Sequence, residues 1–382
     1  MKKKSFEVEV NPQIIKWVIN TSGWSINDLS QKSIASENTI KKWIKGEKYP
    51  TFRQLENLSK YLKRPVAVFL LPNPPEEKPL PKDHRTLPEN RKNKFDKKTI
   101  LAIRIARRLQ GIVKELGENL NQDFEPKISF LKLSDNPKEI AESYRNKFQI
   151  TEEVQKNWKS SYFAFNTLRK LIEDMNILVF QLPMPIEDAR GFVLTDDIPP
   201  VIVINSKDEI IEARIFTLLH EFAHILLGES GIDMPENSLL TYTTDKIEKW
   251  CNDFASLFLL PTPIAMKMFK QYRGSLTQWD TLHKLSVNYK VSKGMLLYNM
   301  KKFNYITKVE YEQILNELRG TPTVKRKGGL PPYKKCISQK GWRTISLVTT
   351  NLEKGFITTC DVLDYLSIKH KQFDKLLSEI ER

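Results

Sequence analysis

Along residues 11–71, apolar positions follow the spacing of several short helices and not the alternation of strands. Pro12 suits the first turn of a helix, Ser25 and Ser36 are typical N-caps, and Gly46 is a typical stop. This pattern predicts a compact bundle, with helices at about 12–22, 26–33, 37–45 and 50–62 and an apolar run at 66–71.

The pattern changes after residue 98. Apolar residues with helical spacing come first, and they predict helices at 99–120, from Pro137 onward and at 162–175. Three short β-branched or aromatic runs follow, and they predict the strands of a small sheet at 177–180, 191–194 and 201–204. Helices are then expected at 208–227 and 244–260, further on to about 318, and in the last 40 residues. The expected fold class is α+β and mostly α-helical.

Breaks in this pattern divide the 382 residues into parts. Six prolines lie between residues 72 and 88, and a second proline- and glycine-rich basic stretch follows residue 318. The predicted organisation is an N-terminal bundle at 1–71, a Pro-rich basic linker at 72–98 and a central α+β domain at 99–318. A basic linker with a helical C-terminal module follows at 319–382.

Composition narrows the class of protein. The apolar runs are far shorter than the roughly 20 residues of a membrane helix, and no secretory signal is visible. Three widely spaced cysteines give no disulfide framework, so we expect a cytoplasmic protein with no membrane partner. The net charge of +15 is clustered, with 13 basic and 6 acidic residues in 1–65 and 11 basic and 3 acidic in 78–108. Such clusters indicate nucleic-acid binding, although a solvated surface has the same appearance.

The most informative motif is His220-Glu221-Phe222-Ala223-His224 within an otherwise apolar helix. Histidines at positions i and i+4 share one helix face, so both imidazoles can bind one cation. Glu221 is placed to take a proton from a metal-bound water. The pattern predicts one Zn²⁺ per chain, with Glu221 as the catalytic base.

A catalytic zinc site needs a third protein ligand. The next predicted helix offers Glu248, and one turn later Asn252 is suited to a hydrogen bond to a ligand. Cys251 is a chemical rival as ligand, or a small buried filler. Arg190, Tyr242 and His283 are unranked candidates for stabilising an oxyanion, and strand 191–194 is a candidate edge strand for an extended peptide.

These residues resemble the ImmA/IrrE family of zinc metallopeptidases. The resemblance is carried by the segments 216–224, 248–255, 259–261, 190–192 and 200–205. It implies a zincin-like peptidase domain with a small β-sheet and an HExxH helix. In that family the two histidines and a later glutamate bind zinc, which corresponds to His220, His224 and Glu248, and Glu221 is the base. Its members cut DNA-binding repressors.

The N-terminal bundle resembles the XRE/Cro-type helix-turn-helix, on segments 23–25, 36–43, 46–47 and 50–51. Such a fold places its second helix, here 37–45, in the major groove of duplex DNA. The candidate base-reading and phosphate-binding residues are Glu37, Asn38, Thr39, Lys41, Lys42, Lys45 and Lys48. A protein-docking role for the same bundle is the alternative.

Together the two resemblances cover most of residues 11 to about 318 and match a fused architecture of regulator and peptidase. In that architecture the segment 83–87 recurs between the modules, and His84 within it is a candidate neighbour of the active site. The expected function is a DNA-binding regulatory metalloendopeptidase whose partners are an operator and a repressor substrate. The alternative is a transcriptional repressor or antitoxin-like protein, with a PIN-like toxin as partner, whose peptidase fold senses or docks.

Overall fold

The computed structural model describes residues 6–32, 34–83, 95–229, 231–233, 246–320 and 329–380. The chain forms two compact units. The first comprises residues 1–80 and 93–105, and the second comprises residues 81–92 and 106–382. Both are mostly helical and the second also contains a small sheet, which confirms the α+β class. No helix in the described ranges is long and apolar enough to cross a bilayer.

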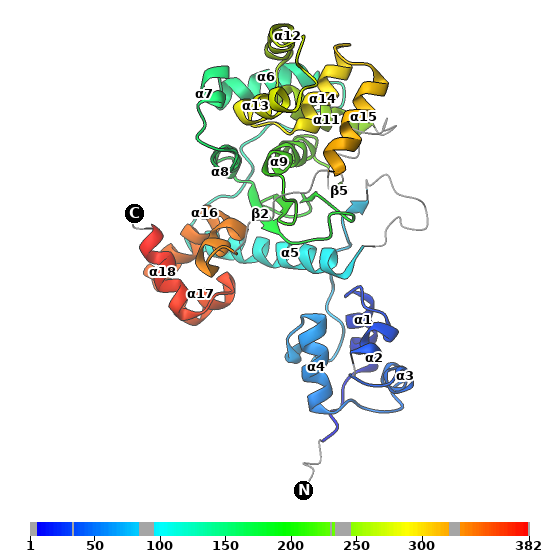
Figure 1. Ribbon diagram of the computed structural model, residues 1–382. Helices are drawn as coiled ribbons and strands as arrows, with labels where there is room; N and C mark the ends of the chain where they lie inside the picture. Colours follow the sequence, from blue (N-terminus) through cyan, green and yellow to red (C-terminus); the bar gives the residue numbers. More distant parts are fainter. Residues whose placement is uncertain are drawn as a thin grey trace. The chain divides into compact units, whose positions relative to one another are not determined.

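The first unit is a bundle of short helices around one apolar core. Its helices are α1 (Pro12–Asn20), α2 (Ile26–Gln31), α3 (Glu37–Lys45) and α4 (Phe52–Leu62) (Figure 1), followed by the 3-10 helix η1 (Val66–Leu70). The start of α5 (Lys97–Glu118) also belongs to this unit. The predicted caps are confirmed: Ser25 makes a capping box with Asp28, Ser36 caps α3, and Gly46 ends α3 at φ 76°. Ile40 and Trp43 lie on the inner face of α3 and pack into this core.

The sheet of the second unit has five strands in the order β1-β5-β3-β4-β2. Their bounds are β1 (Lys82–Asp83), β2 (Leu178–Leu182), β3 (Gly191–Leu194), β4 (Val201–Asn205) and β5 (Gly231–Asp233). The three predicted strands are confirmed within two residues at each end. The short strands β1 and β5 were not predicted.

The predicted edge position of strand 191–194 is wrong. β3 pairs antiparallel with β4 on one side and with β5 on the other, through Gly191↔Asp233 and Phe192↔Ile232. β1 adds to β5 in parallel, and β2 adds to β4 in parallel. The edges of the sheet are therefore β1 and β2, and β3 has no free side along its first two residues.

Helices cover the sheet of the second unit. They are α6 (Pro137–Lys147), α7 (Glu152–Lys156), α8 (Ser161–Glu173), α9 (Ile211–Leu226), α11 (Lys246–Leu259), α12 (Thr262–Gln271), α13 (Trp279–Tyr289), α14 (Lys293–Lys302) and α15 (Lys308–Gly320). Helix α9 packs on β3 and β4 on one side and on α8 and α11 on the other. Figure 1 shows α9 between the sheet and the layer that contains α6, α11, α13 and α14.

The C-terminal module is helical, as predicted, with α16 (Pro332–Glu353), α17 (Thr359–Leu366) and α18 (His370–Ile380). Helix α16 lies along the edge strand β2 and shares an apolar core with α5 (Figure 1). It is broken at Gly341, whose φ of 81° and ψ of 157° lie outside the helical region. The predicted domain boundaries at residues 71, 98 and 318 stay predictions.

Candidate metal centre

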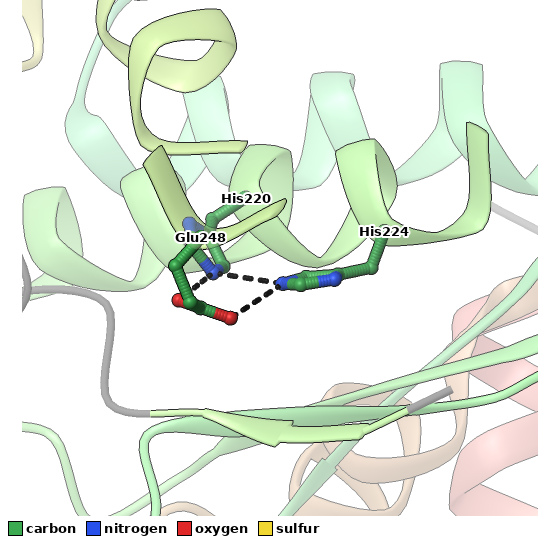
Figure 2. A group of neighbouring side chains, drawn as sticks. All are labelled: His220, His224 and Glu248. Atoms are coloured by element: carbon green, nitrogen blue, oxygen red, sulfur yellow. Dashed lines mark hydrogen bonds and ion pairs between the residues drawn. The ribbon is translucent and has the colours of Figure 1, made fainter. Parts of the chain in front are cut away.

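Two packed helices bring the predicted metal donors together. His220 and His224 lie one turn apart on α9, and Glu248 lies in the first turn of α11. The other residues of α9 are almost all buried and apolar, which fixes this helix between the sheet and α11. Its two imidazoles therefore point to one place, and α11 supplies the carboxylate there (Figure 2).

The three side chains approach one another closely. The Nε2 atoms of His220 and His224 are 3.1 Å apart. The Glu248 carboxylate lies 3.3 Å from His224 Nε2 through Oε1 and 3.5 Å from His220 Nε2 through Oε2 (Figure 2). Ligands about 2.0–2.1 Å from a tetrahedral ion are about 3.3–3.4 Å from each other. The group thus has the donor types and the spacing of three corners of a metal tetrahedron, and it could bind a metal ion.

Burial and charge fit this reading. Both histidines are 0% exposed and Glu248 is 2% exposed, so each would be costly to bury without partners. Burial alone would raise the pKa of Glu248, but hydrogen bonds from the imidazoles of His220 and His224 outweigh it and lower that pKa. Glu248 is therefore ionised at neutral pH and offers a negative donor, which suits a divalent cation.

Glu221 follows His220 on α9 and is fully buried against the sheet. Its carboxylate lies against the backbone of β3, where an added Cβ at Gly191 would be 2.4 Å from Glu221 Oε1. Only glycine at position 191 leaves room for this carboxylate. Gly191 therefore has a positioning role, which the periodicity of the sequence does not reveal. The only signal in the sequence is that a glycine begins a strand of otherwise large residues.

The other predicted residues of the site have different surroundings. Cys251 is fully buried in the apolar core of α11 and is not one of the grouped donors, whereas the rival Glu248 is. Asn252 is 6% exposed, and within the described ranges its Oδ1 accepts no hydrogen bond. Its predicted bond to a ligand stays a prediction.

Of the oxyanion candidates, Arg190 forms an ion pair with Asp208, with Nη1 and Oδ2 2.5 Å apart. Asp208 also accepts from the backbone N–H of Ile210 and so holds the chain where α9 begins. His283 is exposed on α13. Tyr242 and His84 lie outside the described residues.

The predicted DNA-contacting residues lie on α3 or directly after it. Asn38, Lys41, Lys42, Lys45 and Lys48 are exposed, and Glu37 and Thr39 are half-buried. Some of these side chains have protein partners: Lys41 pairs with Glu37 at 3.7 Å, and the Thr39 hydroxyl lies 2.9 Å from that of Ser36. The outer face of α3 is thus polar and basic, and its contact with DNA stays a prediction.

Comparison with known families agrees with this part of the chain. Residues 172–301 match the family model of the peptidase M78 group described as the IrrE N-terminal-like domain. The match begins in α8, ends in α14 and contains all three metal donors and Glu221. It supports the predicted likeness to ImmA/IrrE peptidases for this region, about a third of the chain. No curated protein matches the chain.

Proposed function

We propose that the chain is a zinc-dependent metalloendopeptidase that cleaves a regulatory protein. The observation that carries the proposal is the buried His220–His224–Glu248 group, whose donor separations of 3.1–3.5 Å suit one tetrahedral ion. Two imidazoles and one carboxylate are a donor set of catalytic zinc sites, which leave the fourth position open.

Each residue then has a separate task. His220, His224 and Glu248 hold the ion, which when bound would make water more acidic and polarise the scissile carbonyl. Glu221 is not needed as a ligand, so its carboxylate is available to accept a proton from the attacking water and pass it to the leaving amine. Gly191 has no side chain and so leaves the space beside β3 that the Glu221 carboxylate occupies.

The proposed substrate is a DNA-binding repressor, and the first unit is proposed to bind duplex DNA at an operator. Support comes from the basic outer face of α3 and from the likeness of the bundle to XRE/Cro-type regulators. Binding near the operator would raise the local concentration of a repressor bound there. The antitoxin-like alternative, with a PIN-like toxin as partner, becomes the better account if the chain binds DNA but cleaves nothing.

Replacement of Glu221 by glutamine tests the proposal. Glutamine is nearly isosteric but cannot accept the proton, so cleavage should fall by about 10²–10⁴-fold at unchanged zinc content. The Glu221→Gln protein, tagged and expressed in cells, should also retain its substrate for identification. The measurement is cleavage of the trapped protein by wild type and variant at matched zinc content. Equal cleavage rates would show that Glu221 is not the base. Absence of zinc from the purified wild-type protein would contradict the proposal that it is a zinc-dependent enzyme.

A further inference from the structure

A second site of interest is a large cavity in the second unit that none of the metal donors lines. Its volume is about 1050 Å³, and it lies between α8, the edge strand β2, and the C-terminal helices α16 and α18. Cavities of about 300–1,000 Å³ typically hold small-molecule ligands. The space is therefore large enough for a molecule of drug or metabolite size.

The walls of the cavity combine polar and charged residues with a group of large apolar and aromatic side chains. Their apolar residues are Leu120, Tyr162, Phe165, Ile211, Leu330, Ile337, Trp342 and Leu347. Tyr162 and Trp342 are 46% and 48% exposed, although aromatic side chains of this size are normally buried more fully. Two half-exposed rings beside a cavity suit a flat apolar ligand, which would bury them.

The lining contains three carboxylates and four cations, so one cation has no carboxylate of its own. Each of its three carboxylates pairs with one lining cation, as Glu173–Arg169 at 3.0 Å, Asp174–Lys170 at 3.2 Å and Glu379–Lys334 at 3.7 Å. The fourth cation, Arg343, donates from Nη2 to the neutral amide of Asn176 at 2.7 Å and lies over the Phe124 ring at 5.3 Å. It forms none of the ion pairs found among the described residues, although it also attracts the nearby Glu173 carboxylate, whose ion-pair partner is Arg169. Its buried Nε has no hydrogen-bond acceptor.

We propose that this cavity binds a small aromatic anion, with its flat body against the aromatic wall and its single negative group paired with Arg343. A carboxylate and a sulfonate share the chemistry that this site recognises, because each presents two oxygens to the paired N–H groups of a guanidinium. A multiply charged ligand such as a nucleoside triphosphate does not suit a lining with one unpaired cation.

The cavity is connected to the metal-binding helix by hydrogen bonds. Ser338, in the wall, accepts from Gln181 Nε2 at its carbonyl oxygen and hydroxyl, at 2.9 and 3.1 Å. Gln181 Oε1 in turn accepts from Arg214 Nη1 of α9 at 3.1 Å. Arg214 lies six residues before His220 and also binds the carbonyl of Asp208, where α9 begins. Ligand binding that shifts α16 against β2 is thereby transmitted to the start of α9.

The break of α16 at Gly341 gives this wall a place at which to move. A Cβ at this residue would be 2.3 Å from Glu173 Oε1 and 2.6 Å from Arg169 Nη2. Arg169 itself donates from Nη1 to the carbonyl of Ser338 at 2.7 Å. The two halves of α16 therefore meet at a residue whose backbone only glycine adopts readily, directly beside the ion pair in the cavity wall.

The probe for the binding site is 8-anilinonaphthalene-1-sulfonate, an aromatic monoanion, titrated by fluorescence into the full-length protein. We expect one saturable site per chain. Arg343→Gln should weaken binding about tenfold through loss of a charged hydrogen bond. Arg343→Lys keeps the charge but not the paired N–H groups, so it should weaken binding less than Arg343→Gln. Lys335→Gln removes an exposed cation of the same helix that is not part of the lining, and it should leave the affinity unchanged.

The uncharged analogue N-phenyl-1-naphthylamine tests the contact with the aromatic wall separately from the ion pair with Arg343. It should bind wild type and Arg343→Gln equally, because it has no anionic group. Ser346→Trp, which places a large side chain in the cavity lining, should weaken binding of both probes while the thermal melt stays cooperative. Absence of a saturable site, equal effects of Arg343→Gln and Lys335→Gln, or unchanged binding of both probes to Ser346→Trp would each overturn the assignment.

The connection to α9 is tested by amide hydrogen exchange. The anionic probe should slow exchange in residues 215–226 of wild type, which follow Ile211 of the cavity wall along α9. Arg214→Lys should bind the probe with wild-type affinity but lose this response, because Arg214 does not line the cavity. Unchanged exchange in probe-saturated wild type would overturn the connection, and none of these readouts depends on peptidase activity.

Discussion

Replacement of Gly191 by alanine is the sharpest test of how the sheet positions the Glu221 carboxylate, the proposed base. The added methyl group would lie 2.4 Å from Glu221 Oε1 and 2.8 Å from Thr217 Cγ2. Real Cβ contacts are essentially never below 3.0 Å, so the carboxylate or the strand must move by at least 0.6 Å. Glu221 is fully buried, and Gly191 pairs with both neighbouring strands, so little space is available for either movement.

The size of the effect follows from this displacement. Overpacking of a dense interior costs about 1–3 kcal/mol of stability. A misplacement of about 1 Å at a reacting group costs on the order of 10²-fold in rate, so a shift of about 0.6 Å should cost roughly 10- to 100-fold. Zinc content should not change, because the atoms that Gly191 approaches belong to Glu221 and Thr217 and not to the three donors.

The assay compares cleavage of the trapped substrate, zinc content and thermal stability for Gly191→Ala and for a matched control. Gly294→Ala is that control, since a Cβ at Gly294 meets no atom within 4 Å, and it should keep full activity. Full activity in Gly191→Ala would refute the positioning role. Loss of zinc in parallel with activity would show that the strand disturbs the metal donors and not Glu221 alone.

Three further predictions concern other parts of the chain. His224→Ala should lower zinc content to near zero and remove the rise in melting temperature that added zinc gives wild type, whereas Cys251→Ala should keep stoichiometric zinc by elemental analysis. Lys41→Ala in the full-length chain should weaken duplex DNA binding for all sequences and reduce the slope of log K against log salt by about 1; an unchanged slope would exclude a phosphate contact. Gly341→Ala should lower stability in denaturant melts by about 1–3 kcal/mol more than Gly355→Ala; both have positive φ, but only the first meets side chains, so equal losses would contradict the packing argument.

The parts of this structure that the sequence predicts well are those with local causes. The histidine pair and Glu221 fall on one helix, where a spacing of four residues decides which side chains share a face. The caps at Ser25 and Ser36 and the stop at Gly46 are equally local, because each acts within one turn. These residues could therefore be placed correctly without knowledge of the tertiary fold.

The parts that the sequence does not predict depend on residues far apart in the chain. β1 and β5 contain two and three residues, and their pairing of Lys82 with Gly231 has no local hydrophobic pattern to mark it. The interior position of β3 depends on β5, so an edge was expected where none exists. The space that Gly191 provides for Glu221 also depends on the packing of a strand against a helix some 30 residues later.

The geometry of the His220–His224–Glu248 group, the candidate metal donors, depends on apolar packing at some distance from it. Glu248 reaches the two imidazoles only if α11 keeps a fixed position against α9. That position is held by a cluster of rings in which Phe222 of α9 lies 5.2 Å from Tyr144 of α6 and 6.2 Å from Phe254 of α11, centroid to centroid. A buried ring truncated to alanine leaves a cavity that costs about 3–5 kcal/mol, and neighbouring helices shift to fill part of it. The donor spacing of 3.1–3.5 Å therefore depends on the aromatic cluster as much as on the donors themselves.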